Sequence, residues 1–241
     1  MAGLPAFRRR REVWVPTLLG TTVVLLFALA ATLVFAHGVG RYLARSDPAR
    51  GTEGQGAQTL VVEGWLSAGD LDAAVLAFRA GRYQRVLVSG GPFEDWPEGK
   101  RFATYAERAA DYLRRHGLAE ATVAAVPAPA SAQDRSFLSA VVVRDWSARA
   151  GTPLGAIDVF SSGVHAHRSR LVYRMAFGPS VEVGVLAAAP SGYDIDRWWA
   201  TSAGAKLVVG EVLSVAWTRC CFWPGPRGSF SERWAIPESG A

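Results

Sequence analysis

The chain has 241 residues, of which 50% are hydrophobic and 20% are charged, and this composition suits one globular domain with extra segments. Its net charge of +5 is concentrated near the start of the chain. Without residues 1–36 the chain loses four arginines and one glutamate and keeps 22 basic and 20 acidic side chains, a net of +2. Because nucleic-acid binding needs a concentrated basic face, we expect no nucleic-acid partner.

An uncharged run at residues 13–36 is long enough for a helix that crosses a lipid bilayer, which takes about 20 apolar residues. The four arginines before it predict a cytoplasmic N-terminus at 1–12 and an exported remainder. The alternative is a signal peptide cleaved after 34–36, although the apolar region of such peptides is usually only about 7–15 residues long. We therefore expect an uncleaved transmembrane helix that makes the bilayer a partner of the chain.

The remainder alternates between short apolar runs and segments with apolar residues at helical spacing. Residues 37–58 are rich in Gly, Pro and polar residues and are expected to be a linker. Strands are predicted at 59–63, 85–89, 122–126, 156–160 and 181–186. Helices are predicted at 70–80 and 104–116, from after Ser136 to Arg149, from the turn at Gly163 to near Gly178, and at 205–218. This alternation predicts an α/β fold over residues 59–222, a Rossmann-like parallel sheet with helices on both faces. An irregular C-terminal tail is expected at 223–241.

The two cysteines, Cys220 and Cys221, are adjacent in the sequence. Neighbouring cysteines rarely bridge each other, because a disulfide normally needs a longer Cα separation. We therefore expect no disulfide framework, and the spacing does not fit a zinc site.

Polar residues follow four of the predicted strands. In an open parallel sheet, ligands bind beyond the carboxyl ends of the strands. The four sets are Glu63, then Ser89-Gly90-Gly91, then Asp134-Arg135-Ser136, and finally Ser161, Ser162, His165 and Arg168. We expect these side chains to share one cleft.

The set after the fourth strand carries the chemistry. His165 and Arg168 are three residues apart, so they share one face near the start of a helix, where anions bind well. The alternative is a polar first turn that simply faces water. We expect His165, Glu63 and Asp134 to be catalytic. The residues expected to bind the ligand are Ser89, Gly90, Gly91, Arg135, Ser136, Ser162 and Arg168.

Several known site types do not fit the sequence. Gly90-Gly91 would let backbone N–H groups approach a ligand, but the pair is equally a plain tight turn and lacks the spacing of a dinucleotide or P-loop motif. No G-x-S-x-G elbow is present, and no clustered metal-ligand spacing occurs, so we predict no metal and can name no cofactor. Trp198-Trp199 either walls the cleft or caps the core, and Glu211 either faces the site or pairs with an arginine.

Taken in order, these residues resemble the YdcF/SanA/ElyC-like envelope proteins. The stretches that carry the resemblance cover roughly residues 59–219 and are Leu60 to Leu66, Val88 to Pro92, Asp134 to Ser136, Gly163 to Arg170, Trp198-Trp199 and Gly210-Glu211. The resemblance implies a Rossmann-like domain behind one N-terminal helix in the bacterial inner (plasma) membrane, with the domain extracytoplasmic. It also implies a role in cell-envelope, lipid-carrier or peptidoglycan metabolism.

From these observations we expect a protein that acts on or binds a phosphorylated envelope precursor. Two alternatives stay open. One is a non-catalytic binding or scaffolding module of the envelope, and the other is a nucleotide-binding domain.

Overall fold

The computed structural model describes residues 15–51, 54–93, 101–131 and 134–233. The chain divides between His37 and Gly38 into two compact units. The first unit holds most of helix α1 (Leu18–Leu43), which is long and apolar enough to cross a membrane. The predicted span at 13–36 lies largely within this helix, and its first two residues fall outside the described part of the chain. This helix fits single-pass membrane anchoring.

The second unit is built on a five-stranded sheet whose strands are all parallel, in the order β3-β2-β1-β4-β5. The strands are β1 (Thr59–Glu63), β2 (Arg85–Gly90), β3 (Val123–Pro127), β4 (Ala156–Ser162) and β5 (Glu182–Ala188). The helices are α2 (Ala68–Ala80), α3 (Tyr105–Arg115), α4 (Arg135–Arg149), α5 (Ala166–Phe177), α6 (Ser202–Cys220) and α7 (Phe230–Arg233). Short 3-10 turns are η3 (Glu120–Thr122), η4 (Gly163–His165) and η5 (Ile195–Ala200). The predicted α/β fold is confirmed.

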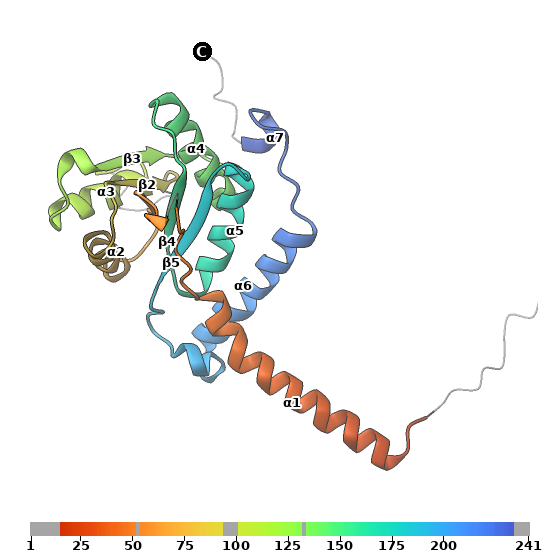
Figure 1. The fold of residues 1–241 in the computed structure, drawn as a ribbon. Coiled ribbons are helices and arrows are strands. Elements are labelled where there is room, and N and C mark those ends of the chain that lie inside the picture. The colour runs from red at the N-terminus through yellow and green to blue at the C-terminus, as the bar shows by residue number, and fades with distance from the viewer. Residues whose placement is uncertain (1–14, 52–53, 94–100, 132–133, 234–241) are drawn as a thin grey trace, which may run out of the picture. The chain divides into compact units, whose positions relative to one another are not determined.

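Helices cover both faces of the sheet (Figure 1). On β1, Leu60 and Val62 pack into the core formed with α2 and α3, while Val61 packs into the core formed with α4 and α5. This alternation follows from the two-residue period of a strand. Because β1 is central and covered on both sides, all five of its residues are buried. The reversal of strand order between β1 and β4 creates the crevice where such sheets bind ligands.

The starts of α2 and α3 are fixed by local side-chain caps. The Ser67 hydroxyl accepts a hydrogen bond from the Asp70 amide, so α2 begins before the predicted residue 70. Thr104 and Glu107 form a capping box, in which each side chain accepts a hydrogen bond from the other residue's backbone. These caps explain why the two helices begin where they do.

Much of the predicted linker packs against the domain. Val39 and Leu43 are buried at the end of α1, and Ala49 is buried further on. The buried carboxylate of Asp158 on β4 accepts hydrogen bonds from the Ala49 amide and the Tyr83 hydroxyl, each at 2.7 Å. The expectation of a free linker at 37–58 is therefore wrong for this part, because the stretch is tied to the sheet by a buried polar contact.

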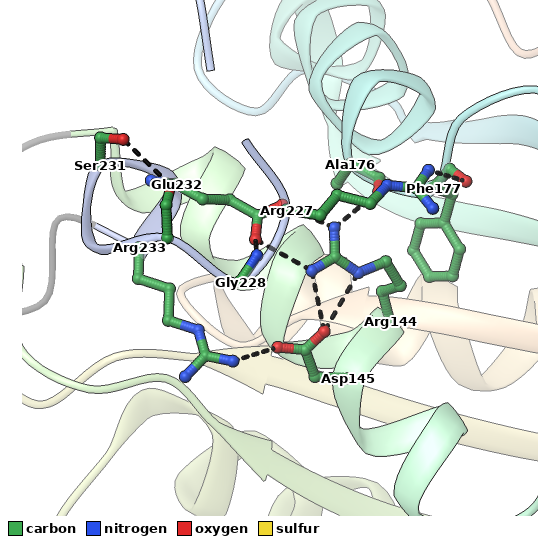
Figure 2. Close-up of polar contacts among 10 residues, drawn as sticks. Arg144, Asp145, Ala176, Phe177, Arg227, Gly228, Ser231, Glu232 and Arg233 are labelled. Atoms are coloured by element: carbon green, nitrogen blue, oxygen red, sulfur yellow. Dashed lines mark hydrogen bonds and ion pairs between the residues drawn. The ribbon is translucent and has the colours of Figure 1, made fainter. Parts of the chain in front are cut away.

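The described part of the C-terminal tail is also anchored (Figure 2). The Glu232 side chain on α7 is 2% exposed and binds the Arg144 guanidinium of α4 at 2.7 Å, while Arg144 also contacts Asp145 at 2.8 Å. Arg233 reaches the other oxygen of Asp145 at 2.9 Å. The tail at 223–241 was expected to be irregular, and α7 corrects this expectation for Phe230–Arg233, which a buried ion pair holds on α4. Residues 234–241 of this tail lie outside the described part of the chain.

The expectation that the two adjacent cysteines do not bridge each other is wrong. Cys220 and Cys221 form a disulfide at the end of α6, with their Cα atoms 3.8 Å apart. The bond closes within two consecutive residues, so it ties no distant parts of the chain together. It leaves the fold dependent on its hydrophobic core rather than on a disulfide framework.

Candidate functional site

A cavity of about 780 Å³ lies at the carboxyl ends of the strands, in the crevice between β1 and β4. All but two of the predicted site residues line it: Glu63, Ser89, Gly90, Gly91, Arg135, Ser136, Ser162 and His165. The two exceptions are Asp134 and Arg168. The sheet topology thus brings together residues from four separate strand ends, as the positions after the strands predicted.

The floor of this cavity is a buried hydrogen-bond network around Glu63. Its carboxylate accepts hydrogen bonds from the Ser161 hydroxyl at 2.5 Å and the Ser169 hydroxyl at 2.9 Å. Beside it, the Ser89 and Tyr173 hydroxyls lie 2.9 Å apart. Burial raises the pKa of Tyr173, and the nearby Glu63 raises it further. The network is possible because the strand period turns the last residues of β1, β2 and β4 toward α5.

On the wall of the cavity, His165 and Glu211 form a hydrogen-bonded pair. Nδ1 of His165 lies 2.8 Å from Oε1 of Glu211, which belongs to α6. Arg168 holds the same carboxylate in a fork, with Nε 2.9 Å from Oε2 and a terminal nitrogen 3.1 Å from Oε1. An ionised carboxylate only accepts hydrogen bonds, so His165 donates to Glu211 in the tautomer that carries its proton on Nδ1. A terminal nitrogen of Arg168 also lies 2.9 Å from Nδ1 and 3.4 Å from Nε2 of the same ring.

The charge state of Glu211 is set by these two partners. Burial of the carboxylate raises its pKa, but the hydrogen bonds from His165 and Arg168 outweigh burial and lower the pKa to about 2. Glu211 is therefore ionised at neutral pH. It orients His165 as the carboxylate of a carboxylate–histidine pair does in many acid–base sites.

Arg168 has a different role from the predicted one. It was expected to bind the ligand, but its guanidinium is engaged with Glu211 and it does not line the larger cavity. The i, i+3 spacing to His165 does place both side chains on one helix face, where they share Glu211 rather than a ligand. Arg168 is thus a positioning residue for the pair.

A second cavity of about 520 Å³ lies beside α4, α5 and α6. Asp134 and Arg168 line it, while Arg135 and Ser136 line both cavities. Asp134 has a positive φ of 50° and precedes α4 without capping it by its side chain. Burial raises its pKa. The predicted grouping of Asp134 with His165 is therefore wrong, because the left-handed turn directs this residue to the other cavity.

The glycines after β2 also differ in their roles. A Cβ on Gly90 would lie 2.9 Å from both the Ala106 amide nitrogen and the Tyr105 Cβ. Gly90 is therefore required by the close approach of α3. At Gly91 the nearest atoms would be 3.9 Å away, so this residue has open space beside the cavity. Of the two, only Gly91 fits the expected backbone approach to a ligand.

Among the lining residues that the sequence-based prediction missed, two have a clear part in shaping the site. The Trp65 ring meets the His165 ring edge-on, with centroids 5.0 Å apart. Arg108 of α3 donates hydrogen bonds to the carbonyls of Gly64 and Leu66, each at 3.0 Å, and so fixes the loop that carries Trp65. Trp65 directly follows the first strand and could have been included on that ground. Arg108 has no such signal, because an arginine within a helix usually faces solvent.

Glu211, in contrast, was recognised as an acid within an apolar helix, with two possible roles. The structure shows both, since it faces the cavity and pairs with Arg168. Trp198 is 8% exposed and packs near Gly40, so this residue belongs to the core, whereas its neighbour Trp199 is 41% exposed.

Among the residues that the structure describes, no group of three or more His, Cys, Asp or Glu side chains is arranged to hold a metal ion. No protein-family model matches the chain, and a comparison with curated proteins finds no significant match. The function must therefore be inferred from the geometry of the site and the resemblance described above.

Proposed function

We propose that this protein is a membrane-anchored enzyme of the cell envelope that binds a phosphorylated envelope precursor in the larger cavity and transfers a proton through His165. The observation that carries the proposal is the His165–Glu211 pair on the wall of a cavity at the crevice between β1 and β4. The resemblance to YdcF/SanA/ElyC-like proteins supports the envelope setting, and the apolar helix supports the anchoring.

The phosphate would bind where helix ends and a cation meet the cavity. The residues of η4 that precede α5 line the cavity, and so do Arg135 and Ser136 at the start of α4. Helix N-termini present backbone N–H groups and a partial positive charge, both of which favour phosphate oxygens. Arg135 adds a full positive charge at the same edge.

The proton would move at Nε2 of His165. With Glu211 accepting from Nδ1, Nε2 can take a proton from an attacking hydroxyl or water and return it to a leaving group. Arg168 keeps Glu211 ionised during this cycle by its two hydrogen bonds. Glu63 keeps its carboxylate between two serine hydroxyls and shapes the floor, so we assign it a positioning role.

A role in binding without turnover is the second candidate. It is favoured by the fact that Glu63 and Arg108, two charged residues of the cavity lining, are hydrogen-bonded within the protein. A lining whose charged side chains already have hydrogen-bond partners within the protein suits a rigid binding site that does no chemistry.

The test uses the purified full chain in nanodiscs. Sugar phosphates, a polyprenyl phosphate and a nucleoside diphosphate would be supplied in turn, with both binding and phosphate release measured. We expect His165→Ala to slow release at least about 100-fold, the usual contribution of a general acid–base group. His116→Ala serves as the matched control, because His116 lies outside both cavities at the end of α3.

The outcomes separate the two candidates. Turnover that His165→Ala abolishes and His116→Ala preserves supports the enzyme. Saturable binding without release by any probe supports the binding module and contradicts the enzyme. Neither binding nor release of any phosphorylated probe would overturn both.

A further inference from the structure

Helix α6 exposes an apolar stripe, two residues of which, Leu213 and Trp217, also line the open second cavity beside α4 and α5. Val209, Leu213 and Trp217 follow one another at intervals of four residues, which places them on one side of the helix. Their exposed fractions are 49%, 64% and 49%. The sole acid of α6, Glu211, faces His165 instead. A contiguous apolar stripe of this kind on a soluble surface marks a contact with another apolar phase or molecule.

Exposed tryptophans also precede and follow the helix in the chain. Trp199 in η5 precedes α6 and is 41% exposed, and Trp223 follows the helix and is 84% exposed. Tryptophan is the residue most typical of the boundary between lipid and water, because its ring is apolar and its N–H remains hydrated. The stripe therefore has the composition of a lipid-facing surface.

The contact between η5 and the end of α1 places this surface near the bilayer. A Cβ on Gly40 would lie 2.8 Å from the Ile195 carbonyl oxygen and 3.0 Å from the Trp198 ring, so α1 and η5 are in close contact at this point. Gly40 is four residues beyond Ala36, the last residue of the apolar run. Four residues span at most about 14 Å even when fully extended. The limit holds for any orientation of the two units.

The reach from Ala36 to Gly40 can be compared with the thickness of the lipid headgroup layer. The layer adds about 5–8 Å on each side of the hydrocarbon core. Residues of η5 that contact Gly40 are thus held within the headgroups or within about 10 Å of them. Helix α6 begins two residues after η5 ends. Exposed Arg197 and Lys206 at this junction can reach anionic headgroups with their long side chains.

We propose that the exposed face of α6, formed by Val209, Leu213 and Trp217 together with Trp199 and Trp223, docks onto the surface of the lipid bilayer. The inference rests on the membrane anchoring that is part of the proposed function, but not on any catalytic activity. Because Leu213 and Trp217 also line the second cavity, docking brings that cavity to the lipid surface, where a membrane-bound ligand is presented.

The test is fluorescence quenching of the full chain in vesicles of phosphatidylcholine and phosphatidylglycerol. Brominated acyl chains quench tryptophans that touch the lipid, and unbrominated vesicles give the reference. We expect Trp199→Phe and Trp217→Phe each to remove part of the bromine-dependent quenching. Leu213→Glu should reduce the quenching of the remaining tryptophans about twofold. A charged side chain is costly to bury in lipid, so the variant should bind the bilayer surface more weakly through this face.

Leu76→Glu is the matched control. Leu76 lies on α2 and is 65% exposed, almost the same as Leu213, but it is outside the proposed surface. Circular dichroism of both variants checks that the fold is intact, and the conservative Trp217→Phe keeps the test valid if Leu213→Glu misfolds. Equal quenching in the wild type and both tryptophan variants would overturn the proposal. Concentration-dependent cross-linking between copies through this face, without quenching, would also overturn it in favour of a dimer.

Discussion

Nδ1 of His165 lies 2.8 Å from Oε1 of Glu211, although the two residues are 46 positions apart in the chain. The contact joins the start of α5 to the middle of α6, and Arg168 braces it from the next turn of α5. Figure 1 shows the two helices packed side by side. Helix α6 is therefore part of the site and does more than cover the domain.

Replacing Glu211 by Gln should weaken the fold in a pH-dependent way. Because the pKa of Glu211 is lowered to about 2 from an ordinary 4.5, its ionised form stabilises the folded state above about pH 4.5. This contribution, on the order of 3 kcal/mol, should disappear as the pH falls from about 4.5 to about 2. Urea unfolding of wild type and Glu211→Gln at pH 7 and pH 3 measures it. A difference between the two proteins that is the same at both pH values would contradict the prediction.

Asp158 should be replaceable by Asn but not by Ala. Burial raises the pKa of this carboxyl, so its charge costs stability as the pH rises above its ordinary value of 3.8. An Asn side chain can still pair with the Ala49 amide and the Tyr83 hydroxyl. We expect Asp158→Asn to change stability by less than about 1 kcal/mol at pH 7, and Asp158→Ala to lose about 2–3 kcal/mol by leaving buried partners unpaired. Chemical denaturation of the two variants compares them, and equal losses would rule this account out.

Removing the charge of Glu232 should loosen the C-terminal segment. Glu232→Gln leaves the guanidinium of Arg144, whose side chain is 16% exposed, without its main carboxylate partner. The expected loss is about 3 kcal/mol in unfolding free energy, as for other broken buried pairs. Glu120→Gln is the control, since Glu120 is 79% exposed in its pair with Arg114 and should cost less than about 0.5 kcal/mol. Similar losses in the two variants would show that α7 is not held by this pair.

The two glycines after β2 should respond differently to the same substitution. Gly90→Ala forces a methyl group against the first turn of α3 and should lower stability by about 1–3 kcal/mol. Gly91→Ala has open space and should leave stability nearly unchanged. Thermal unfolding distinguishes them. If Gly91→Ala abolishes ligand binding while the fold stays intact, the expected backbone approach at Gly91 gains direct support.

The chain's local patterns were sufficient to predict the architecture. Apolar runs of five to seven residues between helical segments indicated a parallel α/β sheet, because strands covered on both faces need no polar alternation. The same logic placed Glu63, Ser89 and Ser162 near one another, since parallel strands end at one edge. Helix starts were less well predicted, because side-chain caps such as Ser67 act over only a few residues.

The sequence by itself thus determined the order of elements, the apolar helix and the placement of eight of the ten predicted site residues at the larger cavity. Tertiary structure alone decided what those residues contact. It turned Arg168 away from a ligand and toward Glu211, separated Asp134 from His165, and packed the supposed linker at Ala49 onto Asp158. Periodicity reports which face of an element is buried, but side-chain partners from distant parts of the chain depend on how the packed helices meet.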